Sequence, residues 1–213
     1  MWVAELWRYP VKSMRGEALD SVEVRADGFV GDRLVQVVDG EGEKITARTR
    51  PDLLAIEATL SPDGQVFVDG RPWQEPEALE LVRRATRNGS RLVDALDRPD
   101  RFDESPLLVA TDGAVSAFGV DRRRFRPNLV IGGVDRYAER EWPEGAVLRA
   151  GEVEISVGHL CERCVMTTID PDTREQDPDV LRRINDELGG LFALNCWVAR
   201  PGRISVGDPV ELT

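Results

Sequence analysis

The stretch SVEVRADGFVGDRLVQVVDG, residues 21–40, decides the fold class. Apolar and polar residues alternate over Ser21–Ala26, and Arg33–Val38 is a second apolar or alternating run, which is the pattern of β-strands. Asp27-Gly28 and Asp39-Gly40 follow these runs, and Asp-Gly pairs between such runs favour hairpins. The stretch therefore predicts antiparallel sheet.

The same alternation of strands and turns continues along most of the chain. Turn signals such as Ser61-Pro62-Asp63-Gly64 and Asp69-Gly70 separate short apolar runs. Val147–Val157 is expected to form a strand pair around Gly151. Single strands are expected at Val3–Tyr9, Leu53–Leu60, Leu107–Ala110, Asn128–Ile131, Leu194–Ala199, Arg203–Val206 and Val210–Leu212.

Two segments carry helix signals. Pro178–Leu188 follows Asp177 at the N-cap position and ends before Gly189, a good C-terminal stop. A shorter helix is expected after Thr111 or Asp112 as N-cap. The chain is therefore predicted to have a β-rich α+β fold, barrel-like and with few helices.

Net charge, hydropathy and the counts of Cys and His exclude several functional classes. The 213 residues include 28 Lys and Arg against 39 Asp and Glu, a net charge of −11, which argues against a nucleic-acid partner. The chain has no run of about 18 apolar residues, so no membrane span is expected. Its first residues do not resemble a signal peptide. Three cysteines favour a reducing cytoplasm over a disulfide framework, and one histidine excludes a multi-histidine metal site.

The segment CERCVMTTIDPD, residues 161–172, carries the chemistry. Cys161 and Cys164 lie three apart at the end of a predicted strand, and Arg163 is expected to lower the pKa of a neighbouring thiol. Such a thiolate is a metal ligand or a nucleophile. From the spacing alone, it is an equally good interpretation that both thiols are buried and inert.

Basic residues stand at several expected strand ends. Tyr9-Pro10 predicts an extended turn that places Lys12 and Ser13 together as an anion-binding pair. Arg33, Arg48 and Arg126 are further candidates, since guanidinium groups bind phosphate or carboxylate. Taken alone, each of these segments is more often an exposed loop than an anion-binding site.

Six segments in this order resemble the MOSC family, the molybdenum-cofactor sulfurase C-terminal domain proteins. The branch of mitochondrial amidoxime-reducing components and bacterial relatives is the most similar. The resemblance implies a MOSC N-terminal β-barrel-like domain over residues 1–97 and a MOSC domain with a β-barrel-like core over residues 98–213. The segments are YPVKS (9–13), GDR (31–33), ITAR (45–48), RFRPNLVI (124–131), CERCVMTTIDPDT (161–173) and ISVGDPVEL (204–212).

The resemblance also implies a molybdenum cofactor, molybdopterin with molybdenum. The second cysteine of the C-x-R-C motif is the ligand in this branch, which makes Cys164 the implied metal ligand and catalytic residue. The other implied cofactor-binding residues are Lys12, Ser13, Arg33, Arg48, Thr111, Asp112, Arg126, Asn128, Arg163 and Thr167.

The implied reaction is reduction of small N-hydroxylated (N–O) substrates. The chain ends without a ferredoxin-like domain, so a separate electron-donor protein is expected, and it has no room for the pyridoxal-phosphate domain of the sulfurases. A non-enzymatic carrier of molybdenum cofactor or sulfur is the alternative. Two further readings are a zinc site of three cysteines with His159, and a nucleophile dyad of His159 with Cys161.

Overall fold

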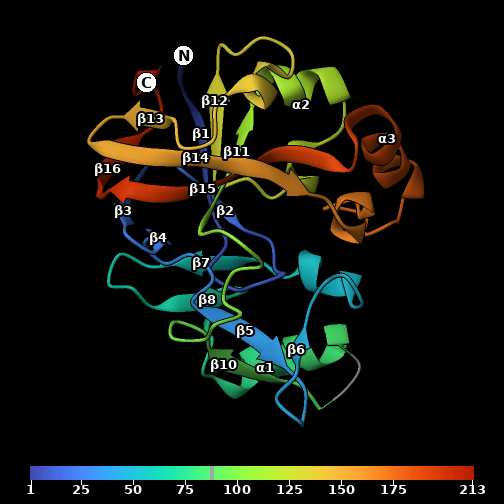
Figure 1. Cartoon of the computed structure of the whole chain (residues 1–213). Coiled ribbons are helices and arrows are strands. Elements are labelled where there is room, and N and C mark those ends of the chain that lie inside the picture. Colours follow the sequence, from blue (N-terminus) through green and yellow to red (C-terminus); the bar gives the residue numbers. More distant parts are fainter. Residues whose placement is uncertain (87–88) are drawn as a thin grey trace.

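The computed structural model describes residues 1–86 and 89–213 (Figure 1). Its main element is an eight-stranded mixed sheet in which only β11 and β12 are parallel neighbours. The described part of the chain is thus strand-rich, as predicted. From edge to edge the strands are β17 (Val210–Leu212), β13 (Val147–Ala150), β14 (Val153–Glu162), β15 (Leu191–Arg200), β11 (Leu107–Thr111), β12 (Leu129–Gly132), β1 (Trp2–Arg8) and β2 (Glu17–Leu19).

The large sheet curls so that its seventh strand approaches its first. Val3 donates its N–H to Asp208 O at 2.8 Å, and Val210 donates to Met1 O at 3.0 Å. Between these strands the described residues form one isolated bridge, Trp2 with Pro209, rather than a ladder. The sheet is therefore barrel-like without closing, and it encloses a core that includes Leu6, Leu107, Leu129, Leu148 and Ile155.

Three small sheets accompany the large one, and two of them lie below it in Figure 1. One of the three joins the two ends of the sequence, because β16 near the C-terminus pairs with β3. The small sheets are β10 (Arg91–Asp94), β5 (Val35–Val38) and β6 (Lys44–Ile45); β16 (Gly202–Ser205), β3 (Ser21–Arg25) and β4 (Gly28–Phe29); and β7 (Ala58–Leu60), β8 (Val66–Val68) and β9 (Arg71–Pro72). The domain division after residue 97 remains a prediction.

Both expected helices are present. The helix α2 (Asp112–Phe118) begins at Thr111, whose side chain accepts from the N–H of Ala114. The helix α3 (Pro178–Leu188) begins at Asp177, which accepts from the N–H of Asp179, and it ends at Gly189 in the left-handed conformation. No helix of the described chain is both long enough and apolar enough to cross a membrane.

The structure differs from the expectations at residues 53–60 and in several elements that were not predicted, among them β2 and β10. Pro51–Ala55 forms the 3₁₀ helix η1, so only Ala58–Leu60 of the expected 53–60 strand is a strand. Pro51 starts this turn, and it buries the consecutive residues Leu53 and Leu54, which a half-buried strand would place on opposite faces. The helix α1 (Pro76–Thr86) was not predicted. The remaining short helices are η2 (Arg122–Arg124), η3 (Ala138–Glu141) and η4 (Val165–Thr168).

Candidate cofactor site

A cavity of about 520 Å³ gathers most of the predicted site residues. This volume lies within the roughly 300–1,000 Å³ of small-molecule sites. Five cationic and three acidic side chains line the cavity, so it is locally basic in a protein whose net charge is −11. The predicted residues at its wall are Lys12, Ser13, Arg33, Arg48, Arg126, Asn128, Arg163 and Cys164.

Three of these residues adopt a left-handed backbone conformation. The φ angles are 70° at Ser13, 51° at Arg33 and 56° at Arg126. Non-glycine residues rarely adopt this conformation, which costs of order 1–3 kcal/mol per residue. Three such residues at one cavity indicate a wall that is shaped for binding at the expense of local stability.

Lys12 is a buried cation that is held by several acceptors. Its Nζ donates to the backbone oxygens of Asp100 at 2.9 Å and Arg101 at 3.1 Å, and it lies 2.9 Å from Asp103 Oδ1. Burial lowers the pKa of Lys12 to about 8, although Asp103 acts in the opposite direction. Burial acts to raise the pKa of Asp103, but Lys12 and Arg48 outweigh it and lower that pKa to about 2. Asp103 thus stays ionised and holds the ammonium group at the cavity wall.

We expect Asp103→Asn to lower the free energy of unfolding by about 1–2 kcal/mol at neutral pH. The substitution removes a charge-assisted hydrogen bond of Lys12, and the effect is modest because the Asp103 side chain is 53% exposed. Because the pKa of Asp103 is lowered from 3.8 to about 2 in the folded protein, ionised Asp103 stabilises the fold above pH 3.8. This stabilisation is lost as the pH falls to about 2.

Chemical denaturation of both proteins across this pH range measures the effect. The two free energies of unfolding should converge at acid pH, whereas a constant difference would contradict the assignment. Glu23→Gln is the matched control, because Glu23 pairs with Arg25 on the exposed surface.

The carboxylate of Asp32 binds three residues at or near the cavity: Tyr9, Arg33 and Asn128. Its carboxylate is fully buried and accepts from the N–H of Tyr9 at 2.7 Å and from Asn128 Nδ2 at 3.2 Å. It also pairs with Arg33 Nη1, and its backbone oxygen accepts from two nitrogens of Arg101. The GDR segment therefore supplies both a cavity arginine and the acid that orients it.

The guanidinium group of Arg126 has hydrogen-bond partners for only some of its donors. Its Nη1 donates to Met14 O at 2.8 Å, and its guanidinium carbon lies 4.1 Å from the centre of the Tyr9 ring. The Nη2 atom is buried and has no hydrogen-bond partner among the described residues. Burial lowers the pKa of Arg126 to about 10, and the nearby Tyr9 hydroxyl acts against this shift. A buried guanidinium with an unused donor favours an anionic ligand.

The two cysteines of the motif have different neighbours. Arg163 Nη1 donates to Cys161 Sγ at 3.2 Å, so the guanidinium group of this arginine is directed at the first cysteine of the motif. Burial acts to lower the pKa of Arg48, but Asp103 and hydrogen bonding with the Cys164 side chain outweigh it and raise that pKa. The cation that faces the Cys164 thiol is therefore Arg48, which is far away in sequence.

Three predicted cofactor-binding residues do not line the cavity and have structural contacts. Thr111 is buried, where it caps α2 and donates its hydroxyl to Glu139 Oε2 at 3.0 Å. Asp112 accepts from the N–H of Gly133 at 2.8 Å. Thr167 is buried and donates its hydroxyl to Cys164 O at 2.9 Å, which fixes the turn that carries the thiol.

Sequence reasoning missed part of the cavity wall. Phe102, Asp103, Glu104 and Ser105 lie on it, although residues 97–105 read only as a polar seam. The charges of that seam were the available signal. Asn195 also lines the cavity from within β15 and donates to Glu104 Oε2 at 2.7 Å.

Two family models match the chain. The MOSC N-terminal beta barrel domain matches residues 1–103, and the MOSC domain matches residues 105–211. The chain belongs to the MOSC family.

Known proteins similar to this MOSC chain include mitochondrial and sulfurase proteins. Human mitochondrial amidoxime-reducing component 1 is 29% identical, and the match covers 99% of this chain and 82% of that protein. Human mitochondrial amidoxime reducing component 2 is also 29% identical, with 98% of this chain and 82% of that protein covered. The molybdenum cofactor sulfurase of Caenorhabditis elegans is 25% identical, and the match covers 86% of this chain and 31% of that protein.

One solved structure supports the fold of the MOSC chain. The crystal structure of the YUAD protein from Bacillus subtilis has a TM-score of 0.50 at 12% identity, and the match covers 100% of this chain and 98% of that one. The likeness concerns the fold alone.

The alternative sites have little geometric support in this MOSC chain. No group of three or more His, Cys, Asp and Glu that could hold a metal occurs in residues 1–86 and 89–213. Cys196 lies in the core, where burial raises its pKa to about 12. His159 Nε2 lies 2.5 Å from Glu104 Oε1 and 3.4 Å from Asn195 Nδ2, so the imidazole contacts these two side chains rather than a thiol.

Proposed function

We propose that this MOSC protein binds the molybdenum cofactor in the basic cavity and reduces small N-hydroxylated compounds. The observation that carries the proposal is the meeting of Cys164 with Lys12, Arg33, Arg48 and Arg126 at one cavity. The relatives named amidoxime-reducing components supply the substrate class. The three thiols are free, in keeping with a reducing location such as the cytoplasm.

The residues present fit an anionic cofactor. Arg163 Nε is a buried donor without a partner in the described chain, and Arg163 lines the cavity. Lys12, Ser13 and Asn128 would hold polar atoms of the pterin and phosphate, while the Cys164 thiolate would hold the metal. When bound, the cofactor supplies a two-electron redox centre that removes oxygen from an N–O bond.

The chain's own residues shape the rest of the reaction. Reduction of an N-hydroxylated compound to the amine consumes two electrons and two protons and releases water. Arg48, whose guanidinium interacts with the Cys164 side chain, would orient that side chain at the cavity wall. Lys12, with its pKa lowered to about 8, is a group of the cavity that can give up a proton near neutral pH. We propose that electrons come from a separate donor protein.

Metal analysis followed by turnover tests the proposal. The protein is produced in a host that makes the cofactor, and molybdenum, zinc and pterin are measured per chain. The loaded protein is then assayed with a chemical reductant and benzamidoxime, and benzamidine is the expected product. Stoichiometric zinc without pterin would overturn the proposal.

A carrier of molybdenum cofactor or sulfur is the second candidate. Cys161 and Cys164 line the same cavity, so a second thiol is available beside the proposed ligand. Loading with molybdenum but no turnover of benzamidoxime would favour the carrier over the reductase.

Cys161→Ser is expected to retain the wild-type molybdenum content. Cys161 Sγ contacts Arg163 Nη1 and Glu162 O, whereas the proposed ligand is Cys164. Elemental analysis of the variant beside the wild type measures the ratio of metal to chain. Loss of molybdenum in Cys161→Ser would contradict the choice of Cys164 as the sole protein ligand.

A further inference from the structure

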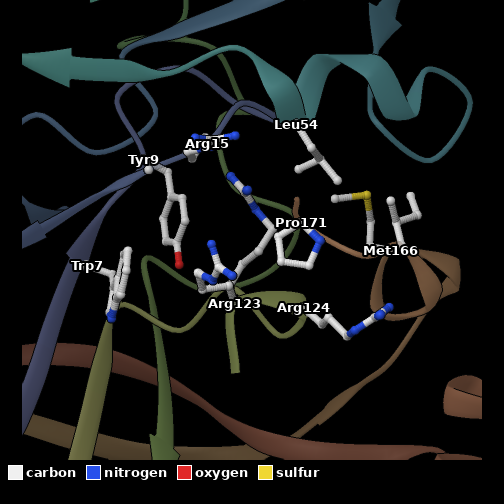
Figure 2. Close-up of a pocket in the computed structure, with 11 residues that line it drawn as sticks. Trp7, Tyr9, Arg15, Leu54, Arg123, Arg124, Met166 and Pro171 are labelled. Atoms are coloured by element: carbon white, nitrogen blue, oxygen red, sulfur yellow. The ribbon is translucent and has the colours of Figure 1, made fainter. Parts of the chain in front are cut away.

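A second, smaller recess lies next to the cofactor cavity (Figure 2). Its volume is about 30 Å³, so it holds only a small group. Arg126 and Met166 line both spaces and thus form part of the wall between them. Figure 2 shows Trp7 and Tyr9 along one side of the recess, with Met166 and Pro171 opposite.

Four arginines line this recess, and two of them are already neutralised. Arg123 donates from two nitrogens to Asp172, at 3.0 and 2.6 Å, and also pairs with Asp121. Arg124 pairs with Asp170 at 2.8 Å and donates to Thr168 O at 2.7 Å. These two guanidinium groups need no further anion.

The other two arginines make no direct ion pair in the described chain, although Asp172 acts on Arg15 and Asp32 acts on Arg126 over a longer distance. The Nε of Arg15 is buried and has no hydrogen-bond partner among the described residues. Arg126 donates once, to Met14 O, and its Nη2 is buried without a partner. A buried donor without a partner costs free energy. Arg15 and Arg126 each have one such nitrogen, and both residues line the recess.

We propose that this recess binds a short-chain carboxylate, such as acetate, at a site separate from the cofactor cavity. A carboxylate offers two oxygens, one for Arg15 and one for Arg126, and its charge compensates both cations. The apolar side chains of Leu54, Met166 and Ile169 suit a short alkyl group. A water molecule would satisfy the donors but would make weaker hydrogen bonds to the two guanidinium groups than a carboxylate does.

The bound anion would link distant parts of the chain. Arg15 follows the YPVKS segment, and Arg126 precedes β12 in the other half of the sequence. Because Arg126 also borders the larger cavity, the anion would stabilise one wall of the proposed cofactor site.

Titration of acetate into cofactor-free protein tests the site, so the outcome is independent of the proposed reductase activity. Pivalate carries the same charge on a bulkier group and serves as the size control at matched ionic strength. Calorimetry measures affinity, and the indole N–H resonance of Trp7 reports on the recess. We expect saturable binding of acetate, weaker or absent binding of pivalate, and a rise in the unfolding temperature with acetate.

Arg15→Gln is the decisive variant, and Arg182→Gln is its control. Arg15→Gln should weaken acetate binding by about tenfold or more. It should fold normally, because Arg15 Nε has no hydrogen bond to lose and the backbone bonds of this residue to Ile56 and Ala58 remain. Arg182 pairs with Asp179 on the exposed face of α3, so its variant should bind like the wild type.

Three results would overturn the proposal. The first is no saturable acetate binding to the wild type, which would leave water as the occupant. The second is equal binding of acetate and pivalate, which would indicate non-specific charge attraction. The third is loss of acetate binding once the cofactor is loaded, which would make the recess a part of the cofactor site.

Discussion

Replacement of Cys164 by alanine is expected to remove molybdenum from the protein. The metal content per chain should fall by more than about tenfold, since even the outer-shell partners of metal ligands are worth 10–100-fold in affinity. Pterin should fall with it, because the pterin and the metal belong to one cofactor. Elemental analysis and the fluorescence of the oxidised pterin measure the two losses independently.

The choice of Cys164 rests on the surroundings of the three thiols. Cys196 is buried in the core with its pKa raised to about 12, which keeps it protonated. Cys161 is engaged with Arg163, whereas Cys164 faces Arg48 at the cavity wall. The hydroxyl of Thr167 donates to the backbone oxygen of Cys164 and so fixes the turn that carries this thiol.

The fold of the Cys164→Ala variant should be unchanged. The side chain is only partly buried, so circular dichroism and the unfolding temperature should match the wild type. Wild-type molybdenum content in a folded Cys164→Ala protein would rule out this cysteine as the required ligand.

Local signals predicted much of the fold. The helix α3 carries its own N-cap at Asp177 and its own stop at Gly189, so it needs no tertiary information. The strands β3 and β5 follow from the apolar and alternating runs of residues 21–40. These features depend on residues that are adjacent in sequence, which is why the sequence suffices for them.

Elements that depend on tertiary burial were harder to predict. The helix α1 buries Ala78, Val82 and Thr86 four residues apart, a usable helical signal within an otherwise polar segment. The segment 53–60 is apolar enough for a strand, yet packing of Leu53 and Leu54 into one core turns its first part into a 3₁₀ helix. Short apolar runs do not by themselves distinguish these outcomes.

In the candidate site, too, local motifs predicted some residues, while contacts between distant segments were not predictable. Motifs pointed to Lys12, Arg33 and Cys164, and the structure places all three at one cavity. The pairing of Arg48 with Asp103 and its approach to Cys164 connect segments 55 or more residues apart, which no local pattern encodes.

Asp32→Ala is expected to cause a large loss of stability, about 3–5 kcal/mol in the free energy of unfolding. The carboxylate is fully buried, and its removal leaves the N–H of Tyr9 without an acceptor. Arg33 Nη1 and Asn128 Nδ2 each lose one of their two acceptors. The loss therefore combines an unpaired buried donor with a positive charge that has lost its carboxylate. Guanidinium denaturation of the wild type and the variant measures it.

The comparison that isolates this effect is with a surface carboxylate. Glu23→Ala removes an acid that pairs with Arg25 in solvent, so little change is expected. Similar small losses in both variants would mean that Asp32 does not hold Tyr9, Arg33 and Asn128 in place. A large loss confined to Asp32→Ala would mean that the anion-binding wall depends on this buried carboxylate, because the residues it orients line or support the cavity.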